Sequence, residues 1–178
     1  MIEPYLQYLP RIDPEAWIHA QAVVIGDVSI GPRSTVWPGC VLRGDQGAIR
    51  IGAETSLQDG TIAHATLGQS NTTVGSGCVV GHRVILHGCQ VEDDCLVGMG
   101  AVLLDGCRIG RFSIVGAGAV VPVGRVIPER SLVLGIPARV VRQVTDQEIE
   151  ATIHHGRDEY LRLCQDYRLR DAHRLPPA

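Results

Sequence analysis

The repeat that dominates this sequence is six residues long. Written in sixes from residue 18, the chain reads IHAQAV VIGDVS IGPRST VWPGCV LRGDQG, and an aliphatic residue stands first in every six. An antiparallel sandwich would need a period of two and hairpin turn pairs, which the sequence lacks. A unit this short buries its apolar residues only by stacking on the next unit, so the period predicts a solenoid.

The period continues through most of the chain and is interrupted three times. It slips by three residues before residue 51, slips again across ATLGQSNTT, and loses one residue near Gln90. After these interruptions the first positions are Ile51, Leu57 and Ala63, then Val74, Val80 and Leu86, then Val91, Val97, Leu103, Ile109, Val115 and Val121.

This pattern resembles the hexapeptide-repeat signature of the left-handed parallel β-helix, in which three sixes form one triangular coil. The resemblance implies an all-β fold over residues 1–143, with the first and fifth positions pointing inward. Glycine is frequent at the second position, where we expect it to supply unusual backbone angles at a corner. The fifth position favours small residues, and it holds four cysteines that we interpret as core residues: Cys40, Cys78, Cys95 and Cys107.

From about Val144 the pattern becomes helical. Thr145 followed by Glu148 forms a capping box, and we expect Gly156 to break the helix. An apolar stripe runs through Ile149, Ile153, Tyr160, Leu163 and Tyr167. We therefore expect residues 144–178 to form a C-terminal helical segment that packs back along the solenoid, with a frayed end at RLPPA.

Composition bears on which partners the protein binds and on the cellular compartment in which we expect it. The formal net charge is -3, which gives no reason to expect nucleic-acid binding, and aromatic residues make up only 4% of the chain. No segment is apolar enough to span a membrane, and the first residues lack a signal-peptide pattern. With six cysteines interpreted as reduced thiols, we expect a cytoplasmic protein.

The six-residue frame places three histidines. We name the solenoid faces A, B and C after the coil that begins with Ile51, Leu57 and Ala63. His64 and His87 follow the first positions of face C in successive coils, so they are stacked neighbours about 4.8 Å apart that point outward. His82 is the third residue of a six on face B, so within one chain it points away from the other two.

All three histidines meet only if a second subunit contributes. Hexapeptide-repeat prisms commonly form threefold trimers, in which face C of one chain meets face B of the next. His82 of one subunit would then join the neighbour's His64 and His87 in a homotrimer. Three imidazoles with one open position form a catalytic zinc arrangement, although Co2+ and Fe2+ also accept imidazole ligands.

Polar residues surround the predicted site. Arg43 lies on face C beneath His64, and Asp59 lies on face B beneath His82. We expect an Arg43–Asp59 ion pair between subunits, with Asp45 and Gln58 close to the metal. The remaining histidines, His19, His154, His155 and His173, are interpreted as solvated.

The segments LRGDQGAIRIG, SLQDGTIAH, VGHRVILHGC, VGMGAVLLDG and LGIPARVVR resemble the gamma-class carbonic anhydrases over roughly residues 10–143. The resemblance implies that His64, His82 and His87 bind zinc, and that Arg43, Asp45, Gln58 and Asp59 are the polar residues of the active site. It implies a lyase in which metal-bound hydroxide hydrates carbon dioxide to bicarbonate. The C-terminal HHGRDEYLRL is most similar to a bacterial subgroup linked to phenylacetate and carnitine metabolism.

Two departures from that family predict weak hydratase activity. The loop after the first histidine, ATLGQSNTT, lacks the family's acidic proton shuttle, and Gln46 replaces the glutamate after RGD. We expect Asp45 and buffer to replace the missing proton shuttle only in part. Three alternatives stay open: an acyl-CoA thioesterase that uses the same metal, a hexapeptide acyltransferase with a lone histidine base, and a non-catalytic trimeric metal-binding scaffold.

Overall fold

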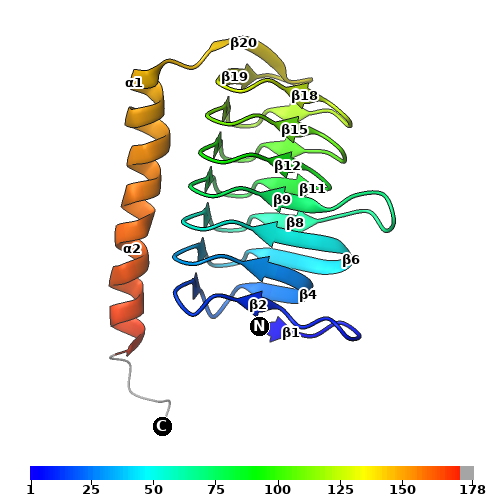
Figure 1. Cartoon of the computed structure of the whole chain (residues 1–178), viewed down its shortest axis with the longest axis vertical. Helices are drawn as coiled ribbons and strands as arrows, with labels where there is room; N and C mark the ends of the chain where they lie inside the picture. The colour runs from blue at the N-terminus through cyan, green and yellow to red at the C-terminus, as the bar shows by residue number, and fades with distance from the viewer. Residues whose placement is uncertain (173–178) are drawn as a thin grey trace.

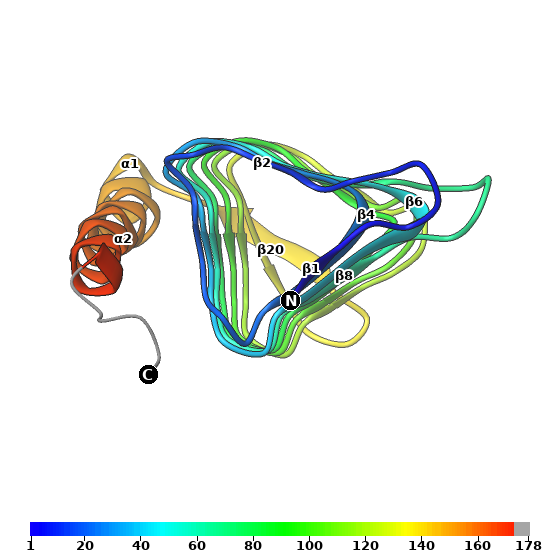
Figure 2. The same cartoon turned by 90° about the horizontal axis from the view of Figure 1, so that it is seen from below.

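The chain folds into a triangular prism with one long helix beside it (Figure 1). This is a computed structural model, and it describes residues 1–172, so the expected fraying at RLPPA lies outside the described residues. Seen from below, the chain turns anticlockwise as it moves away from the viewer, which makes the coil left-handed (Figure 2). The predicted left-handed parallel β-helix with a C-terminal helix is confirmed.

Each face of the prism is a ladder of short parallel strands. Two long strands, β4 (Val23–Ile30) and β6 (Val41–Ile51), turn a corner and belong to faces C and A. The other strands of face C are β1 (Ile2–Glu3), β8 (Ile62–His64), β11 (Ile85–His87), β14 (Val102–Leu103) and β17 (Val120–Val121). Face A adds β2 (Arg11–Ile12), β9 (Thr72–Val74), β12 (Gln90–Val91), β15 (Arg108–Ile109) and β18 (Val126–Ile127).

Face B is a separate sheet. It contains β3 (Trp17–Ile18), β5 (Thr35–Val36), β7 (Ser56–Leu57), β10 (Val79–Val80), β13 (Leu96–Val97), β16 (Ile114–Val115) and β19 (Ser131–Leu134). An antiparallel strand, β20 (Arg139–Gln143), closes the top of this sheet against β19. Because the ladders are in register, a residue's place in its six fixes its neighbours one coil above and below.

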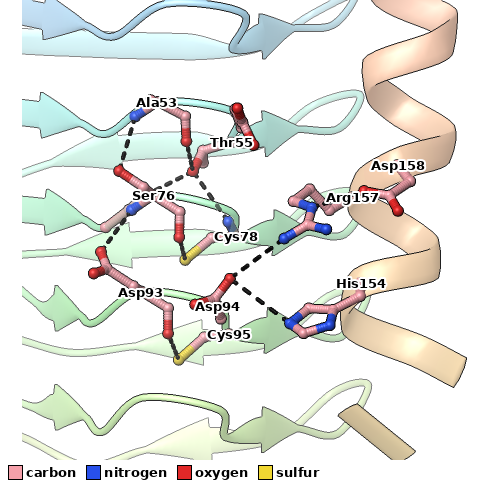
Figure 3. Close-up of polar contacts among 12 residues, drawn as sticks. Ala53, Thr55, Ser76, Cys78, Asp93, Asp94, Cys95, His154, Arg157 and Asp158 are labelled. Carbon is pink, nitrogen blue, oxygen red and sulfur yellow. Dashed lines mark hydrogen bonds and ion pairs between the residues drawn. The ribbon is translucent and has the colours of Figure 1, made fainter. Parts of the chain in front are cut away.

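The core consists of the inward residues that the period predicts. Leu42, Leu57, Leu86 and Leu103 are fully buried, and so are the four fifth-position cysteines. Hydroxyls and thiols at the fifth position donate to backbone carbonyls of the next coil. Thr55 Oγ1 lies 2.7 Å from the Gly75 oxygen, and Cys78 Sγ lies 3.1 Å from the Glu92 oxygen. Figure 3 shows part of this column.

Glycine is needed at the second position for a different reason from the one expected. Gly52 and Gly98 do not have positive φ; instead, a Cβ on Gly98 would lie 2.5 Å from the Ala117 nitrogen in the next coil. Positive φ falls at the fourth position, as at Gly39, Glu54 and Arg83. Close approach of successive coils, rather than a corner angle, therefore requires glycine at the second position.

The helical segment begins as predicted at the Thr145–Glu148 capping box. It comprises α1 (Asp146–Glu148), a π-helical stretch η1 (Ile149–His154) and α2 (His155–Ala172). The expected break at Gly156 is wrong, because α2 continues through it. Gly156 instead lets the helix approach face B, where an added Cβ would lie 3.4 Å from Val79 Cγ2.

The helix packs on face B at its corner with face A. Ile149 and Ile153 are buried against outward residues of face B, including Leu96 and Ile114. Lower down, Tyr160 and Tyr167 pack edge-on against Trp37, at ring-centroid distances of 5.6 and 5.1 Å. Polar contacts anchor the N-terminal part of the helical segment to Asp94, which lies 3.8 Å from Arg157 Nη1 and 4.0 Å from His154 Nε2 (Figure 3). In residues 1–172 no helix is long and apolar enough to cross a membrane.

Candidate metal centre

His64 and His87 form the first half of the candidate site. They end β8 and β11, which pair in parallel register and place one histidine directly over the other on face C, as the period predicts. His64 Nδ1 lies 3.3 Å from His87 Nε2, and the ring centroids are 5.3 Å apart. Two ring nitrogens therefore face each other across a short gap.

The far nitrogen of each ring is held by an aspartate. His64 Nε2 lies 3.1 Å from Asp45 Oδ1, and His87 Nδ1 lies 2.7 Å from Asp105 Oδ2. A carboxylate at one ring nitrogen fixes the orientation of an imidazole and makes the other nitrogen a better metal ligand. Both rings thus have the arrangement of a metal-binding histidine.

His82 has the same arrangement at a different corner. It lies in the turn between β10 and β11, and its Nδ1 is 2.9 Å from Asp59 Oδ2. Its side chain is 45% exposed, which leaves Nε2 available to an external group. No group of three potential metal ligands comes together within residues 1–172 of one chain. The chain therefore offers a two-histidine face and a one-histidine corner.

The other predicted site residues lie beside these histidines. Arg43 Nη1 donates to Asp45 Oδ2 at 2.5 Å, while Asp59 contacts His82. Gln58, next to Asp59, is buried and lines an apolar groove with His82. The expected Arg43–Asp59 pair between subunits stays a prediction, since only one chain is described.

Sequence reasoning missed Asp105 and the residues that hold it. Ser70 Oγ donates to Asp105 Oδ1 at 2.6 Å, and Ser70 also accepts from the Thr66 nitrogen. Thr72 Oγ1 bridges the backbone of His64 and Gly88. The available signal was the repeat frame, because Leu86 pairs with Leu103 and Asp105 therefore stands one residue past the position directly above His87.

Electrostatics keep the two aspartates of face C ionised. Burial raises the pKa of Asp45, but hydrogen bonds from Arg43 and His64 outweigh it, so the pKa lies below its usual value. Burial likewise raises the pKa of Asp105, and hydrogen bonds from Ser70 and His87 bring it below the usual value. Charged carboxylates behind the imidazoles suit a site that holds a cation.

The donor set fits a divalent metal. Two nitrogens bound tetrahedrally to zinc at about 2.0–2.1 Å lie roughly 3.3–3.4 Å apart. This matches the 3.3 Å between His64 Nδ1 and His87 Nε2. The two rings are therefore spaced as ligands of one ion before any ion is added.

The histidines interpreted as solvated differ from one another. His155 is exposed, as expected. His154 is partly buried and lies 2.9 Å from Glu150, and the His19 ring packs against Trp17, so neither is simply solvated. His173 lies outside the described residues.

Known proteins resemble this chain over most of its length. The family model for bacterial transferase hexapeptide (six repeats) matches residues 10–44 and 88–122. Protein YrdA of Escherichia coli is 40% identical over 173 residues, which is 94% of each chain. Gamma carbonic anhydrase 1, mitochondrial, of Arabidopsis thaliana is 40% identical over 168 residues, or 92% of this chain. The chain belongs to the gamma carbonic anhydrase-like family of hexapeptide-repeat proteins.

A protein of a carnitine operon and a solved hexapeptide transferase are also similar to this chain. The carnitine operon protein CaiE of Salmonella newport is 45% identical over 141 residues, covering 79% of this chain and 71% of that protein. The hexapeptide transferase family protein from Anaplasma phagocytophilum has a solved structure with a TM-score of 0.89 and 33% identity, covering 93% and 97% of the two chains. This chain spans 61% of the length of the plant relative.

Proposed function

We propose that this protein is a metal-dependent carbonic anhydrase that hydrates carbon dioxide to bicarbonate. One observation carries the proposal: His64, His82 and His87 each have one nitrogen held by a separate aspartate, and the other nitrogens of His64 and His87 face each other at 3.3 Å. The gamma carbonic anhydrase relatives support this reaction over other metal chemistry. The sequence departures in the loop after His64 lead us to expect modest activity.

We further propose that the site is shared between subunits of a homotrimer. His64 and His87 of one subunit would bind the ion together with His82 of the next. Zinc is the metal that three imidazoles suit best, with Co2+ and Fe2+ as acceptable substitutes. When bound, the metal would lower the pKa of a water molecule enough for it to attack carbon dioxide near neutral pH.

The remaining residues would position and balance the reactants. Asp45, Asp59 and Asp105 orient the three imidazoles and offset the charge of the ion. Arg43, which is 43% exposed in its side chain, would face the neighbour's Asp59 and stabilise the developing anion. Gln58 would direct a hydrogen bond toward the reacting carbon dioxide or the departing bicarbonate.

A second reaction class has some support. The solved hexapeptide transferase neighbour keeps acyl transfer under consideration, and the same activated water would attack a thioester. An acyltransferase needs one histidine base and no metal, whereas here three histidines each have a carboxylate partner. We therefore rank hydration first, thioester hydrolysis second, acyl transfer third and a non-catalytic scaffold last.

The proposal is tested by metal content and activity measured on one sample. Protein purified without oxygen should contain about one metal ion per subunit, and it should hydrate carbon dioxide faster than it hydrolyses acyl-CoA. His64→Ala should lose both metal and hydration, while the control His155→Ala, on the exposed side of the helix, should keep both. Metal-free wild type, or full activity in His64→Ala, would refute the site.

A further inference from the structure

The loop after His64 leaves an exposed leucine that its own chain does not cover. Residues 65–71 connect β8 to β9 and project from the corner between faces C and A (Figures 1 and 2). Leu67 is 68% exposed, and the loop ATLGQSN contains no charged residue. The loop therefore presents a large apolar side chain on an uncharged projection close to the candidate metal centre.

Face B has an apolar groove of about 480 Å³ that begins at His82. Its floor is the backbone at Gly81, Gly98 and Gly116, which stack coil on coil. Met99, 59% exposed, forms one rim next to His82, and Val79 and Leu96 form the rim nearer the helix. Apart from His82 the lining has no ionisable side chain. An uncharged apolar group can therefore bind in the groove without burying an unpaired charge.

The loop cannot reach the groove of its own chain. The groove lies on face B beside the helix, whereas the loop lies at the corner opposite that face (Figure 2). Only the groove of another copy is accessible to Leu67. The shared metal site of the proposed function, on which this inference rests, brings such a groove close.

The distances allow this contact. Nitrogens on one ion lie roughly 3.4 Å apart, so the neighbour's His82 would lie against His64. Leu67 is three residues from His64, a reach of at most about 10 Å. Met99 lies one coil above His82, a further 4.8 Å or so. The groove mouth is therefore within one loop length of Leu67.

We propose that the loop at residues 65–71 of each subunit packs Leu67 into the face B groove of its neighbour, between His82 and Met99. The loop then closes the shared metal site from the side. The wall on this side is then apolar and uncharged, which favours the passage of small uncharged molecules such as carbon dioxide.

A photo-crosslinking experiment tests the contact directly. p-Benzoyl-phenylalanine replaces Leu67, or in a matched control Val123, which is 69% exposed at the same corner of the prism but three coils above the loop. Trimers are co-assembled from nitrogen-15-labelled and unlabelled chains and irradiated. Cleavage after arginine places residue 67 in the peptide 51–83 and Met99 in the peptide 84–108, so a crosslink of mixed isotope composition identifies contact between subunits.

We expect the residue-67 probe to join these two peptides across subunits and the residue-123 probe not to. Zinc-loaded trimers whose residue-67 probe crosslinks only within one subunit, or to a neighbour's residue outside the groove lining, would overturn the loop contact and leave the metal site standing. The crosslink in trimers that bind no zinc when zinc is added would support the loop contact and refute the shared site. A monomer in sedimentation would overturn both.

A second variant tests the energetics. Leu67→Asp places a charge in the apolar groove, whereas Val123→Asp is the exposed control. Losing the buried leucine should raise the dissociation constant of the trimer by about tenfold or more in Leu67→Asp alone. Equal dissociation constants for the two variants would show that Leu67 is not buried between subunits.

Discussion

Three aspartates, each contributed by a neighbouring coil, hold the three candidate ligand histidines. The sequence analysis placed Asp45 close to the metal and expected Asp59 to pair with Arg43, and it did not name Asp105. The repeat frame shows which residues stack, but it does not show which side chains turn toward each other. That depends on rotamers such as the one that Ser70 fixes for Asp105.

Replacing Asp105 tests its role as a support of the metal ligand. Asp105→Asn keeps the shape but removes the charge that accepts from His87 Nδ1, so we expect zinc affinity to fall by roughly 10–100-fold with little change in folding. Competition with a chelator measures the affinity. Asp146→Asn, at a carboxylate whose side chain is 91% exposed, is the control and should bind zinc as the wild type does.

Two glycines give opposite predictions because they have different neighbours. A Cβ at Gly98 would meet backbone 2.5 Å away, so Gly98→Ala should destabilise the fold by about 1–3 kcal/mol. At Gly156 the added methyl would have ordinary contact with Val79, so Gly156→Ala should stabilise by roughly 0.5–1 kcal/mol through helix propensity. Urea unfolding measures the change in the free energy of unfolding for each variant. A change of the same sign in both variants would contradict the prediction.

At the scale of elements, the helix illustrates what a sequence pattern leaves open. The capping box and apolar stripe predicted its start and its buried side correctly. The pattern did not reveal which prism face it covers, although an outward apolar row on face B was a usable signal: Val79, Leu96, Ile114 and Leu132. Gly156 was misread as a break because close helix packing and helix termination both favour glycine.

The capping box makes helix attachment sensitive to acid. Hydrogen bonds from Arg142 and from Thr145 lower the pKa of Glu148 to about 2 from its usual 4.5. A depressed folded-state pKa adds stability above the unfolded value, and this stability is lost as the pH falls toward the folded value. Glu148→Gln should therefore lower the Tm at pH 7, and the deficit should shrink between pH 4.5 and 2.

Thermal unfolding monitored by circular dichroism across that pH range measures this effect. Glu3→Gln, at an exposed residue in the first strand, is the control and should leave the Tm near that of the wild type. A deficit in Glu148→Gln that stays constant down to pH 2 would mean that the charge of Glu148 is not what stabilises the helix start.

At the scale of the whole molecule, the prism was predictable because every coil obeys one period. The way in which subunits assemble was less predictable from the sequence. The sequence showed that His82 lies on a different face from His64 and His87, and the structure agrees, yet one chain cannot test how two chains meet. Subunit contacts depend on surface shape, such as the face B groove, which a repeat pattern does not encode.

Mixing two inactive variants tests the shared site without knowing the substrate. His82→Ala lacks one ligand at every site, and His87→Ala lacks another. If the subunits are co-refolded in equal amounts, about a quarter of all sites join an intact face C to an intact His82 of the neighbour. Zinc binding should recover to about a quarter of wild type. No recovery, with subunit exchange verified by mass, would overturn the site shared between subunits.

The return of the helix to the first coils has a consequence for synthesis on the ribosome. Trp17 Nε1 donates to Asp171 at 2.8 Å, and Tyr160 covers Trp37, so the earliest coils are covered by the last residues made. At about 5–20 residues per second, the 123 residues from Trp37 to Tyr160 take roughly 6–25 s to translate. During that time both tryptophans lack their cover. A chain whose translation stops early never acquires it, so uncovered tryptophans distinguish an unfinished chain from a complete one.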